Sequence, residues 1–219
     1  MTQVKICCIQ SQDEALMAVR YGASAVGLVS ARPSDRGSLP EARIAAIAAR
    51  IPPGAASVLV TIRQEVAAII AQQRRCRVNT VQLADRLMDG TYQELRRALP
   101  GIQIVQVIHV TGEEALEEAQ RIAPQVDSLV LDSGSRDLSQ KELGGTGRTH
   151  DWQISSRICH AVQVPVFLAG GLTPTNVAAA IRQVRPYGVD LCSGVRTDGR
   201  LDEEKVRAFF VAVNGATAM

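Results

Sequence analysis

The chain has 219 residues, of which 46% are hydrophobic and 21% are charged, a composition that is ordinary for a soluble globular protein. This length suits one large domain or two small ones. Lysine and arginine outnumber aspartate and glutamate by only 24 to 22, which argues against nucleic acid or an anionic membrane surface as the partner, so a small molecule is expected.

The N-terminus lacks the basic region and long apolar stretch of a secretory signal, and no run approaches the roughly 20 apolar residues that a membrane span needs. A cytoplasmic location is therefore expected. The five cysteines, an odd number without a repeating spacing, do not suggest a disulfide framework, so reduced thiols are expected. The histidines have no metal-ligand spacing with the cysteines, so no metal site is predicted.

Short apolar and β-branched runs alternate with Ala-rich amphipathic segments along the whole chain. The pattern predicts a single (β/α)8 barrel domain over residues 1–219, in which active groups lie at the carboxyl ends of the strands. A three-layer sandwich is the alternative, although open sheets more usually stop at five or six strands. The strand-like runs are 4–9, 24–29, 57–60, 79–83, 104–110, 127–132, 164–169 and 188–193, and helical segments include 41–51, 64–73, 112–122 and 176–184.

The first predicted strand contains adjacent cysteines, Cys7 and Cys8. Because side chains alternate along a strand, Lys5 and Cys7 share one face, and a lysine is better placed in the barrel interior than against the apolar helix layer. A nearby ammonium favours the thiolate, which makes Cys7 a candidate base or nucleophile. The alternative is that Cys7 is a small buried apolar residue.

The sixth predicted strand ends at Asp132, after a nearly continuous apolar run. A carboxyl group in this partly apolar setting is a candidate general acid or base, and the alternative is a cap of the turn that follows. Next comes a Gly-rich segment, residues 141–152, that carries Arg148 and His150. This segment either closes over a ligand or is merely a mobile loop.

The last two predicted strands are each followed by glycines, in "AGGL" from Ala169 and "CSGV" from Cys192. Exposed backbone N–H groups at such turns are able to hold a phosphate, and barrels of this kind often bind phosphate in the loops after strands seven and eight. The pair of loops therefore predicts a phosphate site, with plain tight turns as the alternative.

Several motifs, taken together and in order, resemble the phosphoribosylanthranilate isomerase family of tryptophan biosynthesis: "KICCI", "VQL", "LVLDS", "GGTGRTHDW", "LAGGLTPTNV" and "VRPYGVDLCSGV". The resemblance spans almost the whole chain. It implies a (β/α)8 barrel that needs no cofactor and acts as an aldose-ketose isomerase. The sequence leaves both a monomer and a homodimer open, because the apolar helix faces that the barrel needs resemble those that could make a dimer. The implied reaction is the Amadori rearrangement of N-(5-phosphoribosyl)anthranilate to 1-(2-carboxyphenylamino)-1-deoxyribulose 5-phosphate.

The same resemblance assigns roles to residues of this chain. It implies that Cys7 is the general base and Asp132 the general acid, the two residues already singled out by their chemistry. Arg36 would pair with the anthranilate carboxylate. The other predicted substrate-binding residues are Gln82 and Gly145, and the predicted phosphate-binding residues are Gly170, Gly171, Ser193 and Gly194.

The chain departs from the family pattern at several positions near the strand ends. Cys8 and Asp85 stand where glycine is usual, and Thr61, Ala84 and Arg196 replace an asparagine, a histidine and a glutamate. Two alternatives to the named isomerase therefore stay open: an enzyme that acts on another aminosugar phosphate, and a phosphosugar-binding barrel without activity.

Overall fold

A closed barrel of parallel strands forms the centre of the protein, in a computed structural model that describes residues 1–30, 38–134 and 149–217. The predicted (β/α)8 architecture is confirmed. The barrel closes where the first strand pairs with the last, with Lys5 opposite Asp190. The strands, in barrel order, are β1 (Gln3–Ile6), β2 (Ala25–Val29), β3 (Ala56–Thr61), β4 (Thr80–Leu83), β5 (Gln103–His109), β6 (Ser128–Asp132), β7 (Val166–Leu168) and β8 (Gly188–Leu191).

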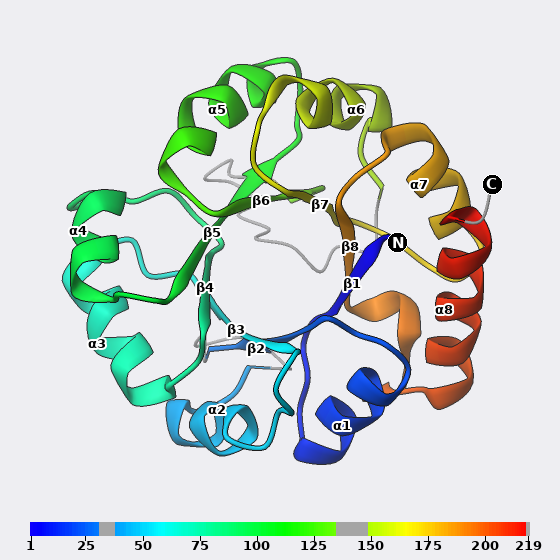
Figure 1. The fold of residues 1–219 in the computed structure, drawn as a ribbon, viewed down its shortest axis with the longest axis horizontal. Helices are drawn as coiled ribbons and strands as arrows, with labels where there is room; N and C mark the ends of the chain where they lie inside the picture. Colours follow the sequence, from blue (N-terminus) through cyan, green and yellow to red (C-terminus); the bar gives the residue numbers. More distant parts are fainter. Residues whose placement is uncertain (31–37, 135–148, 218–219) are drawn as a thin grey trace.

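Helices surround this ring of strands (Figure 1). Side-chain caps fix several helix starts: Ser11 accepts from the Glu14 amide, and Thr91 and Glu94 form a reciprocal capping box. The helices are α1 (Gln12–Arg20), α2 (Glu41–Ala48), α3 (Val66–Cys76), α4 (Tyr92–Ala98), α5 (Glu114–Ile122), α6 (Trp152–Ala161), α7 (Val177–Val184) and α8 (Glu203–Thr217), with short 3₁₀ turns η1 (Ala123–Gln125) and η2 (Ser193–Val195) and a ribbon of β9 (Arg196–Thr197) and β10 (Arg200–Leu201).

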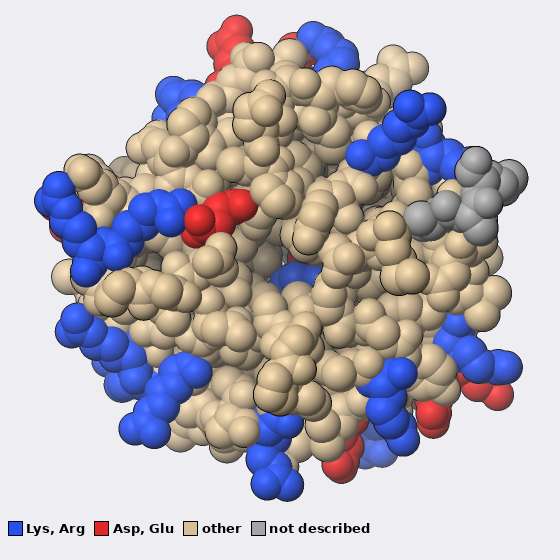
Figure 2. Space-filling view, viewed as in Figure 1, with Lys and Arg blue, Asp and Glu red and all other residues tan. Residues whose placement is uncertain are grey.

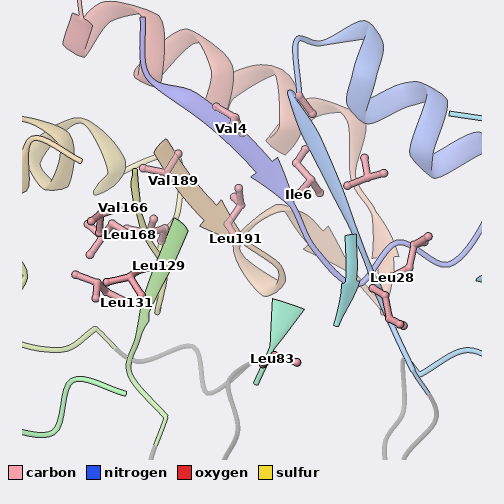
Figure 3. Packing of buried hydrophobic residues seen from close by; sticks show 14 of the residues in the cluster. Val4, Ile6, Leu28, Leu83, Leu129, Leu131, Val166, Leu168, Val189 and Leu191 are labelled. Carbon is pink, nitrogen blue, oxygen red and sulfur yellow. The ribbon is translucent and has the colours of Figure 1, made fainter. Parts of the chain in front are cut away.

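The main hydrophobic core lies between the barrel and the helices. Alternate residues of each strand point outward into this layer, as the two-residue period of a strand requires. Figure 3 shows the layer around Val4 and Ile6 of β1, and both side chains are almost fully buried. The other strand residues labelled there are Leu28, Leu83, Leu129, Leu131, Val166, Leu168, Val189 and Leu191.

The remaining strand residues face the barrel interior, and some of them are polar. Lys5, Gln82 and Asp190 are buried there. Lys5 and Gln82 also line a cavity of about 200 Å³ whose other walls come mainly from the first residues of the strands. Figure 2 shows the surface hollowed near the barrel axis, with most charged side chains at the periphery. Within the described ranges, no helix combines the length and apolar character needed to cross a membrane.

Candidate active site at the carboxyl end of the barrel

Cys7 follows β1 directly and lies half-buried at the carboxyl end of the barrel. Its amide donates to the carbonyl of Leu191 on β8, at 2.8 Å, which continues the pairing of the two strands. Burial raises the pKa of the Cys7 thiol, and the Lys5 ammonium opposes that rise. A methyl group added to Gly27 of β2 would meet both Cys7 Sγ, at 2.6 Å, and Lys5 Nζ, at 3.1 Å, so the predicted placement of Cys7 beside a lysine is confirmed.

Asp132 is the last residue of β6 and is also half-buried. Its Oδ1 accepts a 2.7 Å hydrogen bond from the Ser133 amide, so the carboxylate does cap the start of the turn. Only one of its oxygens has this bond among the contacts of the described residues. Capping therefore leaves the carboxyl group able to serve a ligand at the rim, and the two interpretations of Asp132 are compatible.

The two glycine loops touch each other. A methyl group added to Gly194, after β8, would lie 2.0 Å from the carbonyl oxygen of Leu172, after β7. Gly170 has a φ of +83°, and a methyl group there would meet Ser133 at 2.9 Å. Glycine is required at both positions because backbone and side chains leave no space for a Cβ atom. Ser133, directly after β6, and the loops after β7 and β8 consequently form one continuous arc.

A residue that the sequence did not single out supports this arc. Asn176, just before α7, accepts a 2.8 Å hydrogen bond from the Thr173 amide and donates a 2.9 Å hydrogen bond to the carbonyl of Gly171. The side chain thus holds the loop after β7 in one shape. The signal was present in "GGLTPTNV", since asparagine before a helix often bonds local backbone groups.

The expectation that all cysteines are reduced thiols is wrong for one pair. Cys8 and Cys192 form a disulfide between the ends of β1 and β8, with their Cα atoms 5.8 Å apart. They are separated by 184 positions in sequence, so no local spacing signals the bond. Cys7, Cys76 and Cys159 are free thiols. The disulfide lies between the candidate base and the glycine loop after β8.

Arg196, which stands where the family usually has glutamate, is held by protein groups. Its guanidinium pairs with Glu14 of α1 at 3.0 Å and donates to the carbonyls of Cys8 and Gly199. The Arg196 side chain is only 9% exposed, so these contacts occupy it away from solvent. This substitution therefore braces the loop after β8 against α1.

Two other substitutions also have structural partners. Thr61, at the end of β3, is fully buried and donates a 2.6 Å hydrogen bond to Gln72 of α3. Asp85, after β4, accepts a 2.8 Å hydrogen bond from the Arg86 amide. His109 Nε2, on β5, lies 3.0 Å from the carbonyl oxygen of Ala84. Ala84 stands where the family usually has a histidine, so a histidine from the neighbouring strand contacts the backbone at that position.

The predicted substrate-binding residues fall in different places. Gln82 is buried in the barrel interior, and its Oε1 accepts no hydrogen bond from the described residues. Arg36 and Gly145 lie outside the described residues, as does Arg148. His150 is described and half-buried, with Nε2 2.6 Å from Ser155 Oγ. Burial lowers the pKa of His150, and the Asp132 carboxylate opposes this shift.

Comparison with known proteins identifies relatives over nearly the whole length. A family model described as N-(5'phosphoribosyl)anthranilate (PRA) isomerase matches residues 4–212. N-(5'-phosphoribosyl)anthranilate isomerase 2 of Methanosarcina mazei is 37% identical over 209 residues, which cover 94% of this chain and 92% of the relative.

Solved structures agree. Phosphoribosyl anthranilate isomerase from Thermotoga maritima has a TM-score of 0.82 at 29% identity, covering 98% of this chain and 100% of that one. A phosphoribosyl anthranilate isomerase in complex with reduced 1-(o-carboxyphenylamino)-1-deoxyribulose 5-phosphate has a TM-score of 0.79 at 27% identity, with the same coverage.

Proposed function

We propose that this chain, which belongs to the N-(5'-phosphoribosyl)anthranilate isomerase family, carries out the family's reaction with Cys7 as general base and Asp132 as general acid. The chain is an isomerase that converts N-(5'-phosphoribosyl)anthranilate, an aldose derivative, into 1-(2-carboxyphenylamino)-1-deoxyribulose 5-phosphate, a ketose. This Amadori rearrangement is a step of tryptophan biosynthesis.

One observation carries the assignment of the residues. Cys7 directly follows β1, and Asp132 is the last residue of β6. These strands are remote in sequence, yet both residues lie at the barrel end that also holds the touching glycine loops. A phosphosugar bound to the loops would therefore have a thiol and a carboxyl group within the same rim.

The chemistry needs one acid and one base. The Asp132 carboxyl protonates the ring oxygen of the furanose, and the C1–O bond breaks to give the open-chain Schiff base of anthranilate. The Cys7 thiolate then removes the proton from C2 of the protonated Schiff base, and the C2–H electron pair forms the C1–C2 double bond of an enol-amine. The enol hydroxyl loses its proton while C1 gains one, which gives the ketone product. The atoms of substrate and product are the same, so no redox partner is needed.

The remaining roles belong to the same proposal. Arg36 pairs with the anthranilate carboxylate, and Gly145 and Gln82 contact the substrate. Backbone amides of Gly170, Gly171 and Gly194, with the exposed Ser193 hydroxyl, bind the phosphate, supported by the close contact of the two loops. We further propose that the protein is cytoplasmic. We also propose that it is a monomer or a homodimer, and sedimentation of the purified chain would decide between these two states.

The test mixes purified protein with freshly generated phosphoribosylanthranilate and follows the loss of its anthranilate fluorescence. Cys7→Ala and Asp132→Asn are each expected to lower kcat by about 10²–10⁴-fold, the usual contribution of a positioned acid or base. Cys159→Ala is the matched control, because Cys159 is another half-buried free thiol, on α6. It is expected to keep wild-type turnover.

Full turnover by folded Cys7→Ala would remove Cys7 as the base. Absence of turnover by the folded wild type would favour the two alternatives, and other aminosugar phosphates would be tested next. The substitutions Thr61 and Arg196 give no support to those alternatives, because both side chains are bonded to protein groups.

A further inference from the structure

A buried ion pair lies directly below the proposed base. Lys5 and Asp190 are register partners on β1 and β8, so their side chains emerge on the same face of the sheet. Lys5 Nζ lies 2.6 Å from Asp190 Oδ2, and the two side chains are only 4% and 7% exposed. Burying two charges is costly unless the geometry is close, and a barrel interior is more simply filled by apolar residues. The pair therefore calls for a role beyond packing.

The Lys5 ammonium also reaches Cys7. Burial raises the pKa of the Cys7 thiol, and the Lys5 ammonium, held by Asp190, acts against that rise. Lys5 therefore lies close enough to act on the sulfur at the end of its own strand. Among charged groups of the described residues, Lys5 and Asp190 act most strongly on the pKa of Cys7.

Glycine at position 27 makes room for this contact. A methyl group added to Gly27 of β2 would lie 2.6 Å from Cys7 Sγ and 3.1 Å from Lys5 Nζ. The sulfur and the ammonium therefore converge over the same backbone atom. Any larger residue there would push them apart, because real Cβ atoms do not approach neighbours that closely. The missing side chain at Gly27 therefore leaves room for both atoms.

From this geometry we propose that Lys5 is a positioning residue for the proposed base: Asp190 anchors its ammonium beside Cys7, where the positive charge favours the thiolate that removes the C2 proton. This rests on the proposed function. Burial disfavours the charge of Lys5, but Asp190 and Cys7 outweigh burial and raise the pKa of Lys5, so the ammonium stays charged at neutral pH. Lys5 acts on the Cys7 sulfur more strongly than Asp190 does, so the pair has a net favourable effect on the thiolate.

The test measures the thiolate directly. Iodoacetamide alkylation of Cys7 is followed against pH by peptide mass spectrometry in the wild type and in Lys5→Met. Removing the ammonium is expected to raise the pH midpoint of Cys7 alkylation by about 1–3 units, the usual effect of one neighbouring opposite charge. Cys159 is the internal control in the same samples. Burial raises the pKa of that thiol to about 11, and its alkylation should not change.

Lys5→Met leaves Asp190 buried without its partner, so a second variant protects the test against loss of the fold. Lys5→Met with Asp190→Asn removes both charges and keeps similar shapes. Its midpoint should also lie above that of the wild type, by less than in the single variant, because the opposing Asp190 charge is gone. In turnover, kcat/KM at neutral pH should fall in both variants and recover as the pH is raised.

An unchanged alkylation midpoint in both folded variants would overturn the proposal. The two hypotheses fail in different ways. If the wild type does not isomerise phosphoribosylanthranilate but the midpoint still shifts, the proposed substrate is wrong and the role of Lys5 stands for whatever reaction Cys7 serves. If turnover is normal and the midpoint does not shift, the role of Lys5 alone is wrong.

Discussion

Replacing Gly194 with alanine tests the contact between the two glycine loops. The new Cβ atom would lie 2.0 Å from the carbonyl oxygen of Leu172 and 3.0 Å from its carbonyl carbon. Both atoms belong to backbone, so no side-chain rotation relieves the overlap. The loops after β7 and β8 must separate until the closest contact exceeds 3.0 Å, a movement of about 1 Å.

The expected costs follow from that movement. Forcing an extra methyl group into a packed site costs about 1–3 kcal/mol of unfolding free energy. For a chain of this size, each kcal/mol lowers Tm by roughly 2–4 °C. A 1 Å displacement of groups that position a substrate costs up to about 10²-fold in rate. We therefore expect a lower Tm, a kcat/KM reduced by about 10- to 100-fold and weaker competitive inhibition by inorganic phosphate.

The matched control is Gly215→Ala on α8, where no atom lies within 4 Å of the added Cβ. Alanine is the better helix former, so Tm should stay equal or rise, and kcat/KM should not change. A Gly194→Ala protein with wild-type Tm would refute the packing argument. A lower Tm with unchanged kcat/KM and phosphate inhibition would instead separate this loop from phosphate binding.

Three further outcomes are expected. Reducing the Cys8–Cys192 disulfide, or introducing Cys192→Ser, should lower Tm. The bond closes a long loop, and such bonds typically contribute about 2–4 kcal/mol to the free energy of unfolding. An unchanged Tm in Cys192→Ser relative to the oxidised wild type would contradict this. Burial opposes the charge of Glu14, but Arg196 and two backbone amides outweigh burial and lower the pKa of Glu14 from its ordinary value of 4.5. The contribution of Glu14 to stability should therefore be present above about pH 4.5 and be lost as the pH falls through the lower folded value, so Glu14→Gln should flatten acid unfolding curves; curves that keep the wild-type slope would contradict this. Thr61→Val should lower the free energy of unfolding in urea by about 1–3 kcal/mol, because Gln72 Oε1 loses its hydrogen-bond donor, and kcat should not change. The double variant Thr61→Val with Gln72→Leu should recover part of that loss.

Local patterns were sufficient for the fold and for choosing the candidate site residues. Eight apolar runs separated by amphipathic segments predict eight strands, and the barrel has them. Because active groups of such barrels lie at the strand ends, reading those ends located Cys7, Asp132 and the two glycine loops. The first strand was predicted too long, over 4–9, whereas β1 ends at Ile6 and Cys8 has a left-handed φ of 60°. Nothing local marked that change of backbone direction.

Partnerships across the barrel closure were beyond the sequence. Lys5 with Asp190, Cys8 with Cys192 and Arg196 with Glu14 each join residues more than 180 positions apart. Lys5 meets Asp190 because of the register of β1 against β8, and the other two pairs join segments that follow those strands. Neither segment's own pattern contains the identity of its partner. The sequence by itself determined which chemical groups stand at the rim, because alternation and strand ends are local. Only the tertiary structure decided which of them meet, because closing the barrel brings the two ends of the chain side by side.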